Sequence, residues 1–131
     1  MSRDVFNPDG LVDAPSIGYN HGIVEDGRLY MSGQVGWDED FEVAGDDIES
    51  QTRKAFENVA TLLDAVDKEL ADVTKVTAHI VDPPAHREGF FEVWNEVYDE
   101  QPYPCLTILG PQKLAQEEFL VELEVEVPVE E

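Results

Sequence analysis

Cysteine and positive charge are both scarce in this sequence. The single cysteine, Cys105, excludes an intrachain disulfide, and the 8 Lys and Arg residues are too scattered to form a basic patch for a nucleic acid. No apolar run approaches the roughly 20 residues of a membrane-spanning helix, and the first ten residues lack the basic and apolar segments of a secretory signal. We therefore expect a cytoplasmic protein with neither nucleic-acid nor membrane partners.

Negative charge, by contrast, is abundant. Of the 131 residues, 30 are Asp or Glu, and the formal net charge is −22. The acids occur in every segment, and at ~0.1 M salt, where the Debye length is about 10 Å, their mutual repulsion is only partly screened. This pattern favours the hydrated surface of a halophilic protein; an acidic protein of a non-halophile is the alternative. The hydrophobic fraction of 42% excludes a disordered acidic tail, and the length suits one domain.

The spacing of apolar residues predicts both strands and helices. Asp26-Gly27 supplies the positive φ angles of a tight turn between two strands. Asp46 or Asp47 can cap a first helix, and Pro83-Pro84 can open a second. Residues 1–18 are expected to be an irregular lead-in. The expected strands are 22–25, 28–35, 73–81, 105–109 and 119–127, and the expected helices run from about 47 to 70 and from 83 to 98. This order indicates an α+β fold with helices on one face of a sheet.

Four short strings along the chain match motifs that occur together in one protein family. They are Gly18-Tyr19 with Ser32-Gly33-Gln34, Gln51-Thr52-Arg53 with Asn58, Val93-Trp94-Asn95-Glu96-Val97-Tyr98, and Val121-Glu122-Leu123-Glu124. From about residue 14 to residue 127 the chain resembles the RidA/YjgF family of small homotrimeric proteins, whose members include 2-imino and enamine acid deaminases. The resemblance implies a chorismate-mutase-like α+β sandwich in which a six-stranded sheet carries two helices on one face.

The resemblance also implies a homotrimer with a small-molecule cleft at each subunit interface, and neither a metal nor a cofactor. Such clefts in the family hydrolyse 2-imino or enamine acids to 2-keto acids and ammonia. By the match of motifs, Glu122 corresponds to the acid that activates water, a role that needs a pKa near the working pH. The positions that correspond to ligand contacts are Tyr19, Ser32, Asn95 and Cys105.

One departure from the family pattern bears on this activity. In deaminating members the segment before the cysteine reads Pro-Ala-Arg, and the arginine holds the substrate carboxylate; here the segment reads Pro102-Tyr103-Pro104. Proline has neither a charged fork nor a backbone N–H to offer. The deaminase activity therefore loses its anchor unless another cation, such as Arg28, Arg53 or Arg87, reaches the cleft.

Two other functions stay open on the sequence. A cleft without the arginine suits a neutral or cationic metabolite bound without catalysis, and a trimer without a small ligand suits a scaffold or chaperone-like role. Some members of the family are labelled ribonucleases, but a net charge of −22 opposes RNA binding. Asp38, Asp40, Glu42 and Glu49 have the spacing of a calcium loop, yet the sixth position is Val43, where that loop needs glycine. We therefore expect a solvated acidic loop there.

Overall fold

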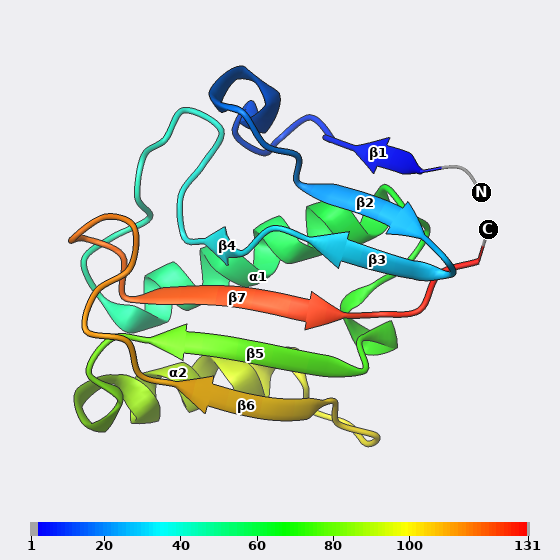
Figure 1. Cartoon of the computed structure of the whole chain (residues 1–131). Helices are drawn as coiled ribbons and strands as arrows, with labels where there is room; N and C mark the ends of the chain where they lie inside the picture. Colours follow the sequence, from blue (N-terminus) through cyan, green and yellow to red (C-terminus); the bar gives the residue numbers. More distant parts are fainter. Residues whose placement is uncertain (1–2, 131) are drawn as a thin grey trace.

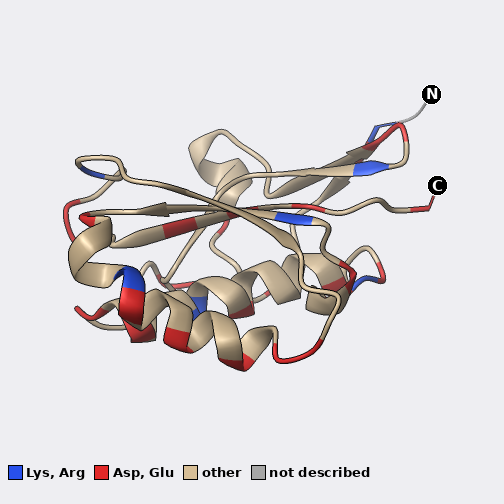
Figure 2. Ribbon diagram, turned by 90° about the horizontal axis from the view of Figure 1, so that it is seen from below, with Lys and Arg blue, Asp and Glu red and all other residues tan. Residues whose placement is uncertain are grey.

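The protein is built as one twisted layer of strands with two helices packed on one of its faces (Figure 1). The computed structural model describes residues 3–130. The helices are α1 (Ile48–Asp64) and α2 (Pro83–Val97), and the view in Figure 2 shows both on the same side of the strands. The strands are β1 (Asp4–Phe6), β2 (Gly22–Glu25), β3 (Arg28–Met31), β4 (Gln34–Val35), β5 (Lys75–Ile80), β6 (Cys105–Leu109) and β7 (Val121–Glu126), and two 3-10 helices are η1 (Ala14–Ile17) and η2 (Leu70–Asp72). The predicted α+β class, with both helices on one face, is confirmed.

The strands form two hydrogen-bonded sheets in the orders β1-β2-β3 and β4-β7-β5-β6. Neighbouring strands pair antiparallel except β5 and β6, which are parallel because α2 carries the chain back between them. The two sheets meet where the Leu29 N–H donates to the Val127 carbonyl at 3.4 Å, beside a bridge between Arg28 and Pro128. They therefore form one continuous layer.

The core lies between this layer and the helices. Val76, Ala78 and Ile80 of β5 are fully buried, and the residues between them are not, as the period of two for a strand with one covered face requires. Burying one large apolar side chain stabilises the fold by about 1.5–3 kcal/mol. Besides β5, the main contributors are Phe56, Val59, Leu62 and Leu63 of α1, Phe90 and Val93 of α2, and Val121, Leu123 and Val125 of β7.

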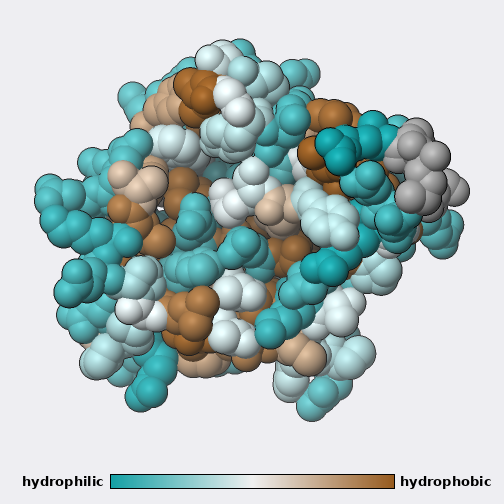
Figure 3. All heavy atoms as spheres, viewed as in Figure 1, coloured by the Kyte–Doolittle hydropathy of each residue, from teal (hydrophilic) through white to brown (hydrophobic). Residues whose placement is uncertain are grey.

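The other side of the strands, which no helix within residues 3–130 covers, is called the open face here. Figure 3 looks onto this face and shows apolar patches set among hydrophilic side chains. Registered partners of neighbouring strands point to the same side, so Glu122 lies beside His79 and Glu124 beside Thr77 on this face. His79 Nε2 lies 2.8 Å from Glu124 Oε2. The acidic row of β7 is therefore displayed on the open face and not on the helix-covered one.

The chain departs from the predicted elements at three places. Residues 4–6 of the supposedly irregular lead-in form β1, which pairs with β2, and residues 14–17 form η1; a three-residue strand is too short to show an alternating pattern. The first helix ends at Asp64 and not near residue 70, because the chain turns through Asp67 at a φ of +60°. The predicted strand 28–35 is interrupted between β3 and β4. With β1 counted and 28–35 taken as one strand, the six strands of the expected sheet are present.

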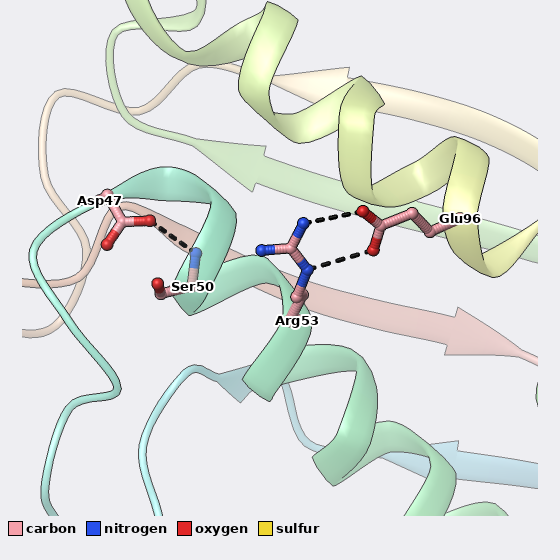
Figure 4. Close-up of polar contacts among 4 residues, drawn as sticks. All are labelled: Asp47, Ser50, Arg53 and Glu96. Carbon is pink, nitrogen blue, oxygen red and sulfur yellow. Dashed lines mark hydrogen bonds and ion pairs between the residues drawn. The ribbon is translucent and has the colours of Figure 1, made fainter.

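Figure 4 shows the side-chain contacts at the start of α1 and between α1 and α2. The Asp47 side chain accepts a hydrogen bond of 2.8 Å from the Ser50 N–H, which confirms the expected cap and holds the pKa of Asp47 below its usual range. Arg53 on α1 donates from Nε and Nη2 to the two carboxylate oxygens of Glu96 on α2, at 3.1 and 2.8 Å. This paired contact lowers the pKa of Glu96.

Acidic residues are spread over the helices and loops, with few Lys and Arg residues among them (Figure 2). Of the charged pairs in the described chain, most are exposed on both sides, and exposed pairs contribute little to stability. Within residues 3–130, neither helix has the combination of length and apolar composition that spanning a bilayer requires.

Candidate functional site

A cavity of about 480 Å³ opens where residues 17–21, 32–37 and 115–122 meet. It lies at the start of β7, between η1, the break from β3 to β4, and the loop before β7. Its size is within the range of small-molecule sites in proteins. The lining residues are Ile17, Tyr19, His21, Ser32, Gly33, Gln34, Val35, Trp37, Ala115, Gln116, Phe119 and Glu122. Three of the residues singled out in the sequence, Tyr19, Ser32 and Glu122, therefore come together here.

Glu122 provides the carboxylate of this cavity, and its position depends on the absence of a side chain at Gly33. A Cβ atom added to Gly33 would lie 2.6 Å from Glu122 Cδ and 2.8 Å from its Oε2, so the carboxyl group rests directly on the glycine backbone. Burial raises the pKa of Glu122 above its usual range; the neighbouring His79 opposes this change and Glu124 adds to it. A carboxylate in this state is a better proton acceptor than one in open water.

Tyr19, which follows η1, and Ser32, which lies between β3 and β4, line the same cavity. Burial, and after it the charge of Glu122, raise the pKa of Tyr19, so its phenol stays protonated and can donate a hydrogen bond. The Ser32 hydroxyl donates to the Asn20 carbonyl at 2.7 Å, and the Ser32 N–H donates to the His21 carbonyl at 2.8 Å. These two hydrogen bonds of Ser32 join the segment between β3 and β4 to residues 20–21 at the rim of the cavity.

A buried polar pair, His21 and Gln34, supports this rim, and neither residue was predicted from the sequence to belong to the site. His21 Nε2 lies 2.8 Å from the Val12 carbonyl, which can only accept, so this nitrogen carries the proton. His21 Nδ1 then accepts from the Gln34 side-chain amide at 3.1 Å, and the same amide reaches the Ser32 carbonyl at 3.2 Å. The Tyr19 ring meets His21 edge to face, with centroids 5.8 Å apart. This network holds Tyr19 and Ser32 in place.

Aromatic side chains form one wall of the cavity, and they too were not predicted from the sequence to belong to the site. The Trp37 and Phe119 rings pack edge to face, with centroids 5.1 Å apart at 89°. On the other side of Trp37, Phe41 packs at 5.0 Å and 89°, and its side chain remains about half exposed. Such geometry is favourable for aromatic pairs. Trp37 and Phe119 line the same cavity as Glu122.

Comparison with known proteins decides the family. The family model described as Endoribonuclease L-PSP matches residues 12–129. This chain belongs to the RidA/YjgF family. The RutC family protein YjgH of Escherichia coli is 33% identical over 110 residues, which cover 84% of this chain and 83% of YjgH. A solved structure of protein YjgH gives a TM-score of 0.90 at 31% identity and covers 100% of this chain and 99% of its own. Yeast Mmf1 shares the fold, with a TM-score of 0.88 at 19% identity and coverage of 98% and 100%.

The RidA/YjgF motif on α1 has a clear structural role. Gln51 is fully buried; its amide donates to the Gly45 carbonyl at 2.9 Å and the Glu118 carbonyl at 2.8 Å, and its oxygen accepts from the Leu120 N–H at 2.8 Å. Asn58 donates to the carbonyls of Val35 and Trp37 at 2.9 and 2.8 Å. These two residues hold the segments that carry Trp37 and Phe119, so the motif positions the aromatic wall of the cavity.

Cys105 and Asn95 lie elsewhere in the single chain. Cys105 is exposed on β6 at the register of Lys75, whereas Glu122 is at the register of His79. Four residues along the sheet and two strand spacings across it separate Cys105 from Glu122 by about 13 Å and about 10 Å, respectively. Asn95 is exposed on α2, on the helix-covered side. Neither lines the cavity of its own chain, and a role for either in ligand binding stays a prediction.

Of the three cations considered as replacements for the family arginine, two are paired with glutamates and the third is exposed on α2. Arg28 Nη2 lies 2.8 Å from Glu126 Oε1, and its guanidinium lies 5.0 Å from the centroid of the Tyr30 ring. Arg53 pairs with Glu96 between the helices, and Arg87 is exposed on α2. Within the described part of this RidA/YjgF chain, none of the three lines the cavity.

Replacing Gly33 with Ala is expected to bring the pKa of Glu122 down toward its usual range. The backbone at Gly33 accepts a side chain, but the new Cβ would occupy the place of the Glu122 carboxyl, which would swing toward solvent. A nuclear magnetic resonance titration of the Glu122 side-chain carboxyl carbon measures this change. The matched variant is Gly36→Ala, whose Cβ would meet the Gln51 backbone at 2.5 Å. It should lower the thermal midpoint, while Gly33→Ala leaves it close to that of the parent. An unchanged Glu122 titration in Gly33→Ala would contradict the packing described.

Proposed function

We propose that this protein hydrolyses small imines or enamines to carbonyl compounds and ammonia, with Glu122 as the base that activates water. The proposal rests on the state of the Glu122 carboxyl group. This group is partly buried in the cavity, packs against Gly33 and has a raised pKa. A general base is most effective when its pKa approaches the operating pH. Partial burial moves the pKa of Glu122 in that direction.

The chemistry needs three proton transfers, and one carboxylate can take part in each of them. Water attacks the carbon of the protonated C=N bond; a C–O bond forms, the π electrons move to nitrogen, and the water proton passes to Glu122. Glu122 then returns that proton to the nitrogen of the resulting carbinolamine. The C–N bond breaks, the oxygen lone pair forms the C=O bond, and the hydroxyl proton returns to Glu122 or to solvent. The sum is an iminium ion and water converted to a carbonyl compound and ammonium.

Tyr19 fits the role of a hydrogen-bond donor in this reaction. Its pKa is raised, so the phenol keeps its proton beside Glu122. A donor at this position can hold the attacking water or the departing nitrogen in line with the carboxylate. Ser32 is already engaged with the Asn20 carbonyl, and we assign it to the rim.

The same proposal includes a homotrimer in which each cleft lies between two subunits. Glu122 and Cys105 belong to opposite ends of the open face and are too far apart to share one ligand within a chain. A contact that joins the Glu122 end of one copy to the Cys105 end of the next is head to tail, and such contacts form a ring when the rotation between copies closes on itself. The exposed apolar residues Tyr30 and Leu109 lie on strands of this face and are suited to burial in such a contact.

A second function is binding without catalysis, and Pro104 is the observation that favours it. The residue that precedes Cys105 carries no charge and no N–H, so position 104 itself offers a ligand carboxylate no anchor, and the cation in register with Cys105 is Lys75 on β5. A cleft of this kind would hold a neutral or cationic metabolite by its apolar wall.

An assay of ammonia release separates the two functions. Imines are generated in the cuvette by an amine oxidase or an amino acid oxidase, and their decay is followed with and without the purified, assembled protein. Hydrolysis predicts a rate that increases in proportion to protein concentration. The assay is run at ~0.1 M and at ~1 M KCl, because a chain with a net charge of −22 experiences very different screening at these salt concentrations. No acceleration at either concentration would reject hydrolysis and leave the binding function.

A further inference from the structure

We propose that the cavity beside Glu122 selects imines that carry an apolar group and no carboxylate, and that it binds them as iminium cations. This inference rests on the proposed function, because it names the class of imine that the same site takes.

The charges that line the cavity oppose an anionic ligand. Within residues 3–130 the lining contains one carboxylate, that of Glu122, and neither lysine nor arginine. A carboxylate on the reacting carbon would approach Glu122, and among the lining residues no lysine or arginine offsets their repulsion; His79, which lies beside Glu122 on β5, is outside the lining. The cations Arg28 and Arg53 are each paired with a glutamate outside the cavity. An iminium nitrogen has the opposite relation to Glu122, which attracts it.

The aromatic wall favours the same class of ligand. Ring faces of tryptophan, tyrosine and phenylalanine attract organic cations, and the attraction grows when the site is partly dry. Trp37, Phe119 and Tyr19 all line the cavity together with Glu122. The remaining apolar lining includes Ile17, Val35 and Ala115, which can contact the hydrocarbon part of a ligand. The volume of about 480 Å³ is sufficient for a phenylalkyl group.

A matched pair of substrates tests the substrate class. The imine formed from 2-phenylethylamine and the 2-imino acid formed from phenylalanine differ by one carboxylate on the reacting carbon. Each rate with the protein is divided by the rate of the same imine without it. We expect this enhancement to be larger by about 10-fold or more for the imine that lacks the carboxylate. An equal or larger enhancement for the imino acid overturns the inference and leaves the proposed hydrolysis standing.

Binding of stable ligands supplies a second measurement that does not depend on turnover. Calorimetric titration compares 2-phenylethylamine, a cation, with 3-phenylpropanoate, an anion of similar size. The amine is expected to bind tighter by about 10-fold or more, and Glu122→Gln is expected to remove most of this preference. If neither imine is hydrolysed but the amine is preferred in this way, the ligand class is supported and the proposed reaction is rejected. If the anion binds as tightly as the amine or more tightly, the inference is overturned.

A variant in the aromatic wall tests the other half of the inference. Trp37→Leu keeps an apolar surface and removes the ring, so it is expected to weaken binding of 2-phenylethylamine by several-fold and to leave 3-phenylpropanoate nearly unchanged. Equal weakening of both ligands would contradict a role of the ring in cation binding. The thermal midpoint of the variant is measured in parallel to establish that it is folded.

Discussion

Replacing Glu122 with Gln is expected to lower kcat for imine hydrolysis by about 100-fold or more, which is the usual contribution of a general base. Glutamine has nearly the same size as glutamate and can pack against Gly33 in the same way, but it cannot take a proton from water. In the parent, the rate should fall as the pH falls through the pKa of Glu122, because the base is active only when ionised. That acid limb is expected above ~4.3, the ordinary pKa of glutamate, because burial raises the pKa of Glu122.

The matched control is Glu124→Gln, on the same strand and the same face. Glu124 pairs with His79 and does not line the cavity, so its replacement should leave kcat within a small factor of the parent. Stability provides a further check. A carboxyl whose pKa is raised by folding contributes stability below its unfolded pKa and loses it as the pH rises through the folded value. At neutral pH, Glu122→Gln should therefore keep or raise the thermal midpoint. Retained turnover in Glu122→Gln would exclude Glu122 as the base.

Replacing Gln51 with Leu is expected to be among the most destabilising single substitutions, at about 3 kcal/mol or more. The leucine would leave the carbonyls of Gly45 and Glu118 and the Leu120 N–H without their partner in three partly buried hydrogen bonds. Each such loss costs about 1–3 kcal/mol. Urea unfolding monitored by tryptophan fluorescence measures the free energy of unfolding, and both tryptophans, Trp37 and Trp94, are part of packed aromatic clusters.

The neighbouring residue offers a control for Gln51. Thr52 is also fully buried, and its hydroxyl has no hydrogen-bond partner within the described residues. Thr52→Val keeps the shape and removes a buried hydroxyl without a partner, so the free energy of unfolding should stay the same or increase. A loss in Thr52→Val as large as that in Gln51→Leu would show that any change on this face of α1 is harmful, and the three hydrogen bonds would then not explain the effect.

Those parts of the fold that depend on local pattern were predictable. The Asp26-Gly27 turn, the Asp47 cap and the alternation in β5 and β7 each follow from neighbouring residues alone, and each is confirmed. β1 could not be predicted, because its three residues are ordered only by pairing with β2. The break between β3 and β4 was also missed, since it depends on the Ser32 N–H reaching the His21 carbonyl and on the Glu122 side chain over Gly33.

The candidate site was predictable only in part. The family motifs predicted Tyr19, Ser32 and Glu122 as site residues, and all three line one cavity in the fold. Trp37 and Phe119 are more than 80 residues apart along the chain, and no local pattern relates them. Gln51 and Asn58 did leave a signal, because they are polar residues seven apart on the apolar stripe of α1, and a buried polar group needs a specific partner.

The way Gln51 and Asn58 fasten the cavity wall also limits how this protein can change its ligand over evolution. Substitutions of these two residues remove the hydrogen bonds that hold the Glu118 and Val35 carbonyls, so such variants are eliminated by loss of folding before any new preference can be selected. Ile17 is different, because it lines the cavity and is 58% exposed. New preferences should therefore accumulate at the mouth, with the acid and its aromatic partners retained across descendants.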